Sequence, residues 1–153
     1  MTDPVNLFAG VWDAEEERLG YRHRRVALGP KLGAELLGTS LYELPTGERT
    51  WPYHWELGAE EWLIVVSGRP TLRVPAGERE LDPGDVICFP EGEGGAHQVV
   101  NRARETALVL IVSTKPGVAI AGFPDSNKLY LSAPDRFEFV VRNEPVDYWE
   151  GEP

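Results

Sequence analysis

The chain has few of the residues that several kinds of site require. Its 153 residues include one cysteine, one methionine and three histidines. A single cysteine excludes an internal disulfide, which fits a reducing compartment. Cys88 lies in the apolar run VICFP, and we interpret it as a buried core residue rather than a nucleophile. Three histidines leave few imidazoles to share among metal binding and acid–base roles.

Basic residues are also in the minority. The chain has 15 Lys and Arg against 25 Asp and Glu, a formal net charge of −10. An acidic surface repels phosphate backbones and anionic membranes, so we expect no nucleic-acid and no membrane partner. The local exception is RHRR, residues 22–25. We interpret it as a solvated strand edge or partner contact, with His23 structural or exposed.

Long apolar runs are missing as well. No run approaches the roughly 20 residues of a membrane helix. The opening MTDPVNLF is too short, and begins too acidic, to resemble a signal peptide. We therefore expect the protein in the cytoplasm.

Long helical patterns are scarce because 16 Gly and 13 Pro interrupt almost every window. The best helical candidate, WDAEEERL (12–19), is short and highly charged, and we expect a turn or an irregular arm there. Apolar runs of strand length recur instead: 24–29, 34–44, 61–68, 70–75, 84–90, 97–103, 106–114, 117–123 and 137–142. Many short strands separated by turn signals predict an antiparallel sandwich or small barrel.

Both ends of the chain are rich in aromatic residues outside this pattern. Residues 1–20 and the segment from 147 onward are interpreted as arms. Their Trp12, Tyr148 and Trp149 are either subunit contacts or side chains that fold back on their own domain.

The stretch PYHWELGAEEW (52–62) carries the first candidate site. On a strand, His54 and Glu56 point to the same face, roughly 7 Å apart along the backbone. Glu61 opens the next strand, where alternation places it on the face of Leu63 and Val65. A carboxylate at the mouth of an apolar face is costly to bury unpaired, and a cation is the simplest partner. Glu60 has the opposite parity and is expected to be exposed.

A second stretch, GDVICFPEGEGGAHQVVN (84–101), adds another imidazole. A strand ends at Pro90, a glycine-rich loop follows, and His97 opens a further strand. Two imidazoles and two carboxylates form an N2O2 set that suits a divalent transition metal such as Fe, Mn, Ni or Zn.

Together the two stretches resemble the two motifs of the cupin superfamily. The first motif matches at Gly47, His54-x-Glu56, Glu61 and Gly68, with one extra residue before His54. The second matches at the set Gly84, Pro90, Gly92, His97 and Asn101, with two extra residues before His97. One departure is that Glu56 stands where the family has a second histidine.

The resemblance implies an all-β fold, the double-stranded β-helix or jelly-roll cupin barrel, with N- and C-terminal arms. It divides the chain into residues 1–33 (arm and first outer strand), 34–142 (the barrel) and 143–153 (tail). It implies a homodimer and a mononuclear site in which the metal ligands are His54, Glu56, Glu61 and His97. Two carboxylates would bring the site's net charge to zero, which makes a bound ion a weaker Lewis acid.

The superfamily hosts many reactions, so the function stays open between three alternatives. The first is a metal-dependent enzyme, dioxygenase-like or isomerase-like, that acts on a small oxygenated substrate. The second is a non-catalytic cupin that binds or senses a small molecule. The third is a structural cupin that has lost its metal.

Overall fold

The computed structural model describes residues 2–142 and 145–151, and the regular secondary structure of this part of the chain is almost entirely β-strand. The strands are β1 (Ala14–Glu16), β2 (His23–Ala27), β3 (Leu37–Leu44), β4 (Trp55–Leu57), β5 (Glu61–Ser67), β6 (Thr71–Val74), β7 (Gly77–Glu80), β8 (Val86–Phe89), β9 (Gln98–Val100), β10 (Ala107–Thr114), β11 (Ala119–Phe123), β12 (Lys128–Ala133) and β13 (Arg136–Val141). The helical turns are α1 (Leu28–Lys31), η1 (Glu93–Gly95) and η2 (Pro124–Ser126). None of the helices in these ranges is both long and apolar enough to cross a membrane.

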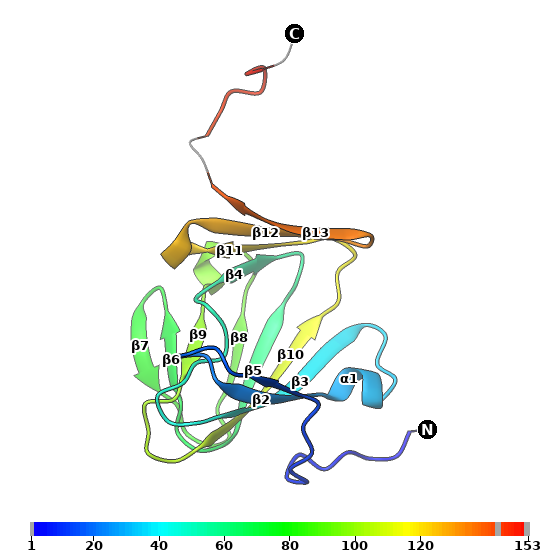
Figure 1. Ribbon diagram of the computed structural model, residues 1–153, viewed down its shortest axis with the longest axis vertical. Coiled ribbons are helices and arrows are strands. Elements are labelled where there is room, and N and C mark those ends of the chain that lie inside the picture. The colour runs from blue at the N-terminus through cyan, green and yellow to red at the C-terminus, as the bar shows by residue number, and fades with distance from the viewer. Residues whose placement is uncertain (1, 143–144, 152–153) are drawn as a thin grey trace.

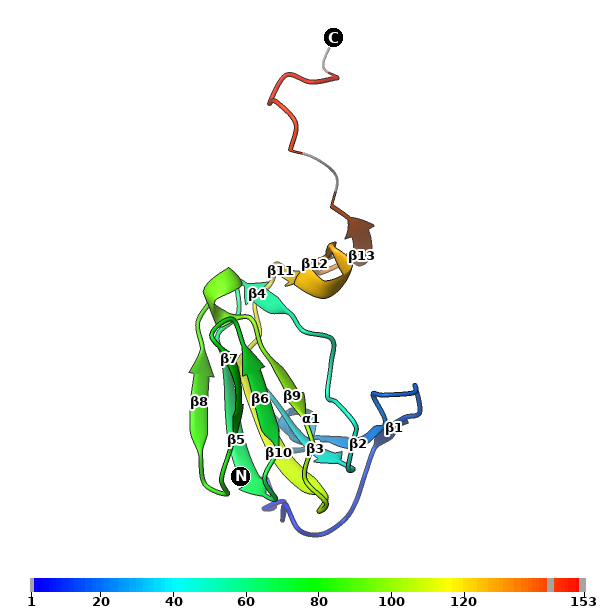
Figure 2. The ribbon, with the colours of Figure 1, turned by 90° about the vertical axis from the view of Figure 1, so that its left-hand side faces the viewer.

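The strands form three antiparallel sheets. One has the order β1-β2-β3-β10-β5-β8, a second β13-β12-β11-β4, and a third β7-β6-β9. The six-stranded and three-stranded sheets face each other, and the four-stranded sheet lies across one end (Figure 1). Figure 2 shows the same arrangement from the side, with the C-terminal segment leading away from the capped end. The all-β prediction is confirmed.

The core fills the space between the two facing sheets. Leu63 of β5, Val109 of β10 and Leu72 of β6 are all 0% exposed and belong to one apolar cluster. Alternation along β5 places Leu63 and Val65 inside, while Trp62 is 43% exposed. As predicted, Glu61 lies on the inner side of this strand and Glu60 is exposed.

Two predictions about individual segments are wrong. Cys88 is exposed rather than buried. It lies on β8, the edge of the six-stranded sheet, where one face of the strand meets solvent and Phe89 takes the inner position. The segment 12–19 contains β1, which pairs with β2, instead of an irregular arm.

The N-terminal segment folds back on its own domain. Trp12 packs against the buried residues Val26, Leu28 and Leu41, and Arg24 lies 5.3 Å from the centre of its ring. Arg24 in turn pairs with Glu43, so part of RHRR serves local ion pairs on the strand. At the other end, Tyr148 and Trp149 are 82% and 71% exposed.

The last residue of the second motif has a structural role. Asn101 is 0% exposed, and its amide donates to the carbonyls of Leu44 at 2.8 Å and Glu105 at 2.7 Å. Its Oδ1 accepts from the N–H of Ala103 at 3.0 Å. The side chain therefore fixes the turn between β9 and β10.

Asn101→Ala leaves three backbone groups without this partner, and the Leu44 carbonyl among them is buried. We expect the free energy of unfolding to fall by about 1–3 kcal/mol, as measured by denaturant unfolding. Arg104→Ala, at an exposed position of the same turn, should change it by less than about 0.5 kcal/mol. Equal effects of the two variants would contradict the assigned role.

Candidate metal centre

The two histidines of the motifs meet through their backbones. His54 and His97 form an isolated antiparallel bridge. The N–H of His54 donates to the carbonyl of His97 at 3.2 Å, and the N–H of His97 donates back at 2.8 Å. Directly opposed residues of an antiparallel pair point to the same face. The two imidazole rings consequently lie 4.8 Å apart, centre to centre, although 42 positions separate them in the chain.

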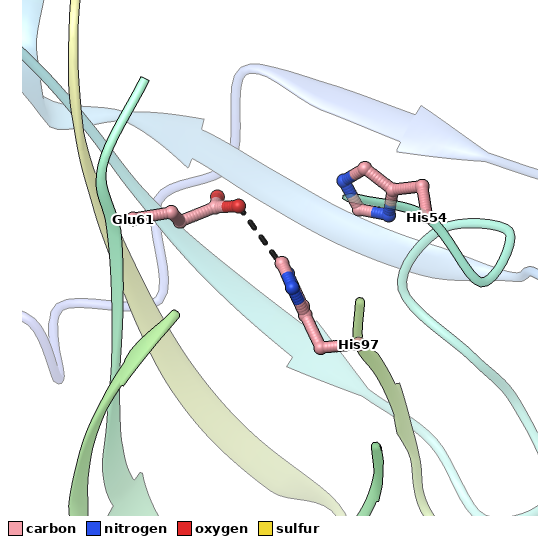
Figure 3. A group of neighbouring side chains, drawn as sticks. All are labelled: His54, Glu61 and His97. Atoms are coloured by element: carbon pink, nitrogen blue, oxygen red, sulfur yellow. Dashed lines mark ion pairs between the residues drawn. The ribbon is translucent and has the colours of Figure 1, made fainter. Parts of the chain in front are cut away.

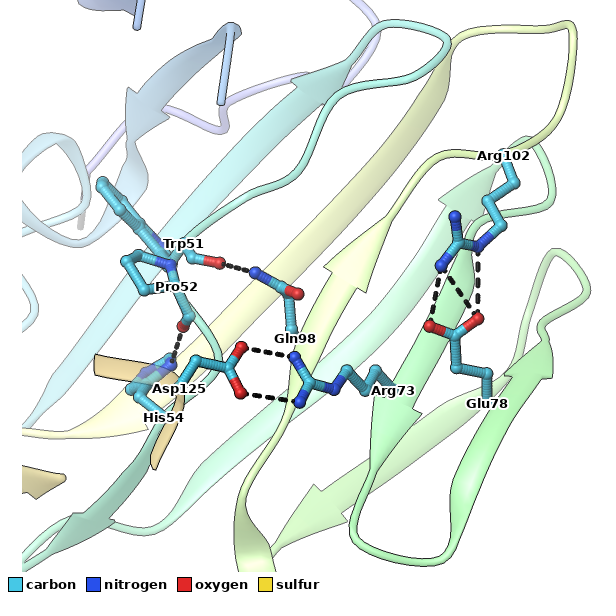
Figure 4. Close-up of polar contacts among 8 residues, drawn as sticks. All are labelled: Trp51, Pro52, His54, Arg73, Glu78, Gln98, Arg102 and Asp125. Atoms are coloured by element: carbon cyan, nitrogen blue, oxygen red, sulfur yellow. Dashed lines mark hydrogen bonds and ion pairs between the residues drawn. The ribbon is translucent and has the colours of Figure 1, made fainter. Parts of the chain in front are cut away.

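Each ring is oriented by a carbonyl two residues earlier. His54 Nδ1 lies 2.9 Å from the carbonyl oxygen of Pro52, as Figure 4 shows, and His97 Nδ1 lies 3.0 Å from that of Gly95. With the proton on Nδ1, this contact fixes the tautomer and leaves the Nε2 lone pair free for a metal. His97 is further held by Phe89, whose ring is stacked on it at 3.7 Å.

Glu61 approaches the histidines from the next strand. The turn between β4 and β5 includes Gly58, whose φ of 86° is the left-handed region that favours glycine. A Cβ at this position would lie 2.7 Å from the carbonyl oxygen of Val118, so the turn also requires a residue without a side chain. After the turn, the Glu61 side chain points at the rings, with its Oε2 3.3 Å from His97 Nε2 (Figure 3).

The geometry of these three residues fits a divalent cation. Their ligand atoms all lie within 4.8 Å of one another. Ligands at about 2.0–2.2 Å from one ion are separated by up to about 4.4 Å, so small side-chain adjustments are enough. Glu61 Oε2 is buried with no hydrogen-bond partner. A buried anionic oxygen without a partner is costly, and a cation between it and the two imidazoles removes that cost.

Glu56 stands beside this group rather than within it. Its Oε1 lies 3.8 Å from His54 Nε2 and its side chain is 31% exposed. The three residues with mutually close ligand atoms are His54, Glu61 and His97. Burial, reinforced by the charge of Glu61, raises the pKa of Glu56 to about 7. The ligand role of Glu56 stays a prediction, and its position also suits a group that exchanges protons near neutral pH.

These carboxylate and imidazole groups give the metal-free protein a distinctive pH response. The pKa of Glu56 is raised from 4.5 to about 7, so this group favours the folded state below its unfolded pKa and loses that contribution as pH rises through 7. Burial, with a smaller effect of His97, lowers the pKa of His54 from 6.5 to about 4. Stability is therefore also lost as pH falls from 6.5 towards 4.

Thermal unfolding in the presence of a chelator tests this response. Between about pH 5 and 8, the melting temperature of the wild type should fall relative to that of Glu56→Gln, which has no carboxyl group to ionise. If the melting temperatures of the two proteins change with pH in the same way, Glu56 is not shielded from solvent.

The third histidine takes no part in the cluster. His23 is 3% exposed and packs edge-on against Tyr42 at 5.4 Å and Trp51 at 5.1 Å. It is a buried structural residue. The rings of Phe89 and Phe123 stack on His97 at 3.7 Å and His54 at 5.9 Å, and the sequence analysis missed Phe123. Phe123 lies outside both motifs, and nothing in its local sequence marks it.

Comparison with known proteins identifies the family. Residues 40–113 match the family model described as Cupin domain. These residues form a cupin domain. The two extra residues that this cupin carries before His97 are accommodated by η1 (Glu93–Gly95), which supplies the carbonyl that orients the histidine.

Solved structures share the cupin fold over most of the chain. A sugar phosphate isomerase from a cupin superfamily of Silicibacter pomeroyi is 27% identical, with a TM-score of 0.76 over 82% of this chain and 81% of that one. The polyketide cyclase of Streptomyces resistomycificus is 26% identical, with a TM-score of 0.58 over 74% and 80%. A Cupin 2 conserved barrel domain protein from Salinispora arenicola is 24% identical, with a TM-score of 0.57 over 75% and 90%. No curated protein sequence matches the chain.

Proposed function

We propose that this cupin is a divalent-metal-dependent isomerase that moves a proton within a small substrate bearing hydroxyl and carbonyl groups. The observation that carries the proposal is the convergence of His54, Glu61 and His97 from three separate segments inside the barrel. Both imidazoles are pre-oriented by backbone carbonyls, so little ordering remains when an ion binds.

Three residues would hold the ion and one would move the proton. A bound divalent ion supplies a Lewis acid that polarises a substrate carbonyl oxygen. Glu56 lies next to the ligand group and partly faces solvent. Its carboxylate would accept a proton from the carbon beside the carbonyl and return it to the former carbonyl carbon, while the proton of the neighbouring hydroxyl passes to the former carbonyl oxygen. Phe89 and Phe123 pack against the two imidazoles and keep water from their faces.

The comparisons favour this branch of the superfamily. The Silicibacter pomeroyi protein, named as a sugar phosphate isomerase, resembles this chain over more than four fifths of both chains. The reaction of an isomerase needs a polarised carbonyl and one proton-carrying group, and the cluster with Glu56 offers both. An oxygenase would need dioxygen in addition.

The direct experiment follows carbon–hydrogen exchange in D₂O. The metal-loaded protein is incubated with a panel of triose, pentose and hexose phosphates, and proton NMR records loss of the signal beside the carbonyl. We expect exchange with at least one member of the panel. Glu56→Gln should reduce the exchange rate by about 10²–10⁴-fold, the usual contribution of a general base, while the protein keeps its metal.

The controls separate the alternatives. Exchange that survives in Glu56→Gln would contradict the proton-transfer role of this residue. A protein that binds metal and a substrate but shows no exchange with any member would be a binding cupin. Consumption of dioxygen with the same panel would point to an oxygenase instead.

A further inference from the structure

A cavity of about 450 Å³ opens at the capped end of the barrel, and none of the four candidate ligands lines it. Its walls include Tyr53, Trp55 and Phe123, and two cationic side chains, Lys128 and Arg142, also line it. The chain carries a net charge of −10, so two cations in one aromatic-lined cavity stand out from the surface around them.

The register of the four-stranded sheet connects this cavity to the metal centre. Phe123 pairs with Lys128 across β11 and β12. Gly122 pairs with Trp55 across β11 and β4, so the next position along the antiparallel ladder brings Phe123 opposite His54. The rings of Phe123 and His54 are stacked at 5.9 Å, and Lys128 Nζ lies 5.6 Å from the centre of the Phe123 ring. His54, Phe123 and Lys128 therefore form one row on the same face.

The length of this row sets the distance between the two sites. Neighbouring strands are about 4.8 Å apart, so the backbone at His54, just before β4, and the backbone at Lys128 of β12 are separated by roughly 10 Å. A molecule of a few carbon atoms with an anionic group at one end fits that span.

Other arginines near this end of the barrel are already engaged. Arg73 makes two contacts with Asp125, at 2.6 and 2.8 Å, and Arg102 makes a similar pair with Glu78 (Figure 4). Lys128 contacts two aromatic rings, those of Phe123 and Phe139, and no carboxylate is within ion-pair distance of it among the described residues.

Glu93, the carboxylate that lines the cavity, competes only weakly with a bound anion for Arg142. Glu93 Oε1 lies 4.0 Å from Arg142 Nη1, and the Glu93 side chain is 77% exposed. An exposed pair at this distance contributes little and is readily exchanged for another anion. With two cationic side chains and one weakly paired carboxylate, the cavity lining has a net positive charge.

We propose that Lys128 and Arg142 bind the phosphoryl group of the substrate, with Phe123 as the spacer between this subsite and the metal centre. The inference rests on the proposed function and names its substrate class, a small phosphorylated hydroxycarbonyl compound. A dianionic phosphoryl group matches two cations, because charge-assisted hydrogen bonds to Lys and Arg are the strong ones.

Binding of inorganic phosphate to the full-length protein tests the subsite, with and without added metal, by isothermal titration and ³¹P NMR. Lys128→Met and Arg142→Gln should each weaken phosphate binding by about tenfold or more. Arg104→Gln removes an exposed charge elsewhere and should leave binding unchanged. Acetate should bind more weakly than phosphate and depend less on both residues.

The outcomes distinguish this subsite from the proposed function. Equal phosphate affinity in all four proteins would overturn the subsite, as would phosphate binding that disappears when metal is removed, because the ion would then be the binding group. Acetate binding as tightly as phosphate would overturn the assignment of a phosphoryl group. None of these results would alter metal content or carbon–hydrogen exchange in D₂O, which test the proposed function separately.

Discussion

His97→Ala is expected to lower the affinity of the protein for divalent metal by more than about 100-fold. Loss of an outer-shell partner of a metal ligand already costs 10–100-fold, and His97 is placed in the inner shell. Its Nε2 lies 3.3 Å from Glu61 Oε2, so the variant removes the imidazole nitrogen that would share the ion with this carboxylate. Competition with a calibrated chelator measures the change.

The other buried histidine supplies the matched control. His23 is 3% exposed but belongs to an aromatic cluster away from the ligand group. His23→Phe should therefore keep the metal affinity of the wild type, even if its stability changes. His97 packs on Phe89, so His97→Ala also removes a packing contact. Thermal unfolding and the near-ultraviolet circular dichroism spectrum serve as the control that the variant is folded. Unchanged affinity in a folded His97→Ala would mean that the metal is bound elsewhere or not by this histidine.

Gly95→Ala is expected to have the second large effect, through the loop that orients His97. A Cβ at Gly95 would lie 1.8 Å from the carbonyl oxygen of Pro90, which is backbone and cannot turn aside. The loop must shift, and with it the Gly95 carbonyl that lies 3.0 Å from His97 Nδ1. We expect a loss of about 1–3 kcal/mol in the free energy of unfolding and a loss of about 10–100-fold in metal affinity.

The neighbouring Gly94 supplies the matched control for Gly95→Ala. A Cβ at Gly94 meets nothing within 4 Å, although Gly94 and Gly95 belong to the same 3₁₀ turn. Gly94→Ala should change metal affinity by less than about threefold, the scale of 0.5 kcal/mol expected of a surface substitution. If both variants behave alike, the effect comes from the flexibility of the loop and not from the contact with Pro90.

The strand pattern was predicted well where strands are apolar and poorly where they are not. The runs of Leu, Ile and Val in segments 61–68 and 106–114 correctly predict β5 and β10. Strand β7 (Gly77–Glu80) was missed because all of its residues are exposed and polar, and only its hydrogen bonds to β6 define it. Strand β12 (Lys128–Ala133) was missed as well, since it follows a turn signal and is only partly buried.

The positions of the candidate site residues follow from the sequence as far as alternation and motif spacing allow. Parity along β5 placed Glu61 inside and Glu60 outside, as the structure has them. Spacing alone does not say how far a flexible side chain reaches, so the place of Glu56 beside the ligand group had to come from the structure. Cys88 shows the same limit, because the apolar run VICFP does not reveal that β8 is an edge strand.

The most direct measurement is anomalous X-ray diffraction from crystals of the metal-loaded protein, recorded on both sides of the absorption edge of the metal. We predict one strong peak per chain inside the barrel, at about 2.0–2.2 Å from His54 Nε2, His97 Nε2 and a Glu61 oxygen. A density map with both imidazoles and the Glu61 carboxylate resolved, but with the anomalous peak at some other place in the molecule, would contradict the assignment of this cluster as the metal centre.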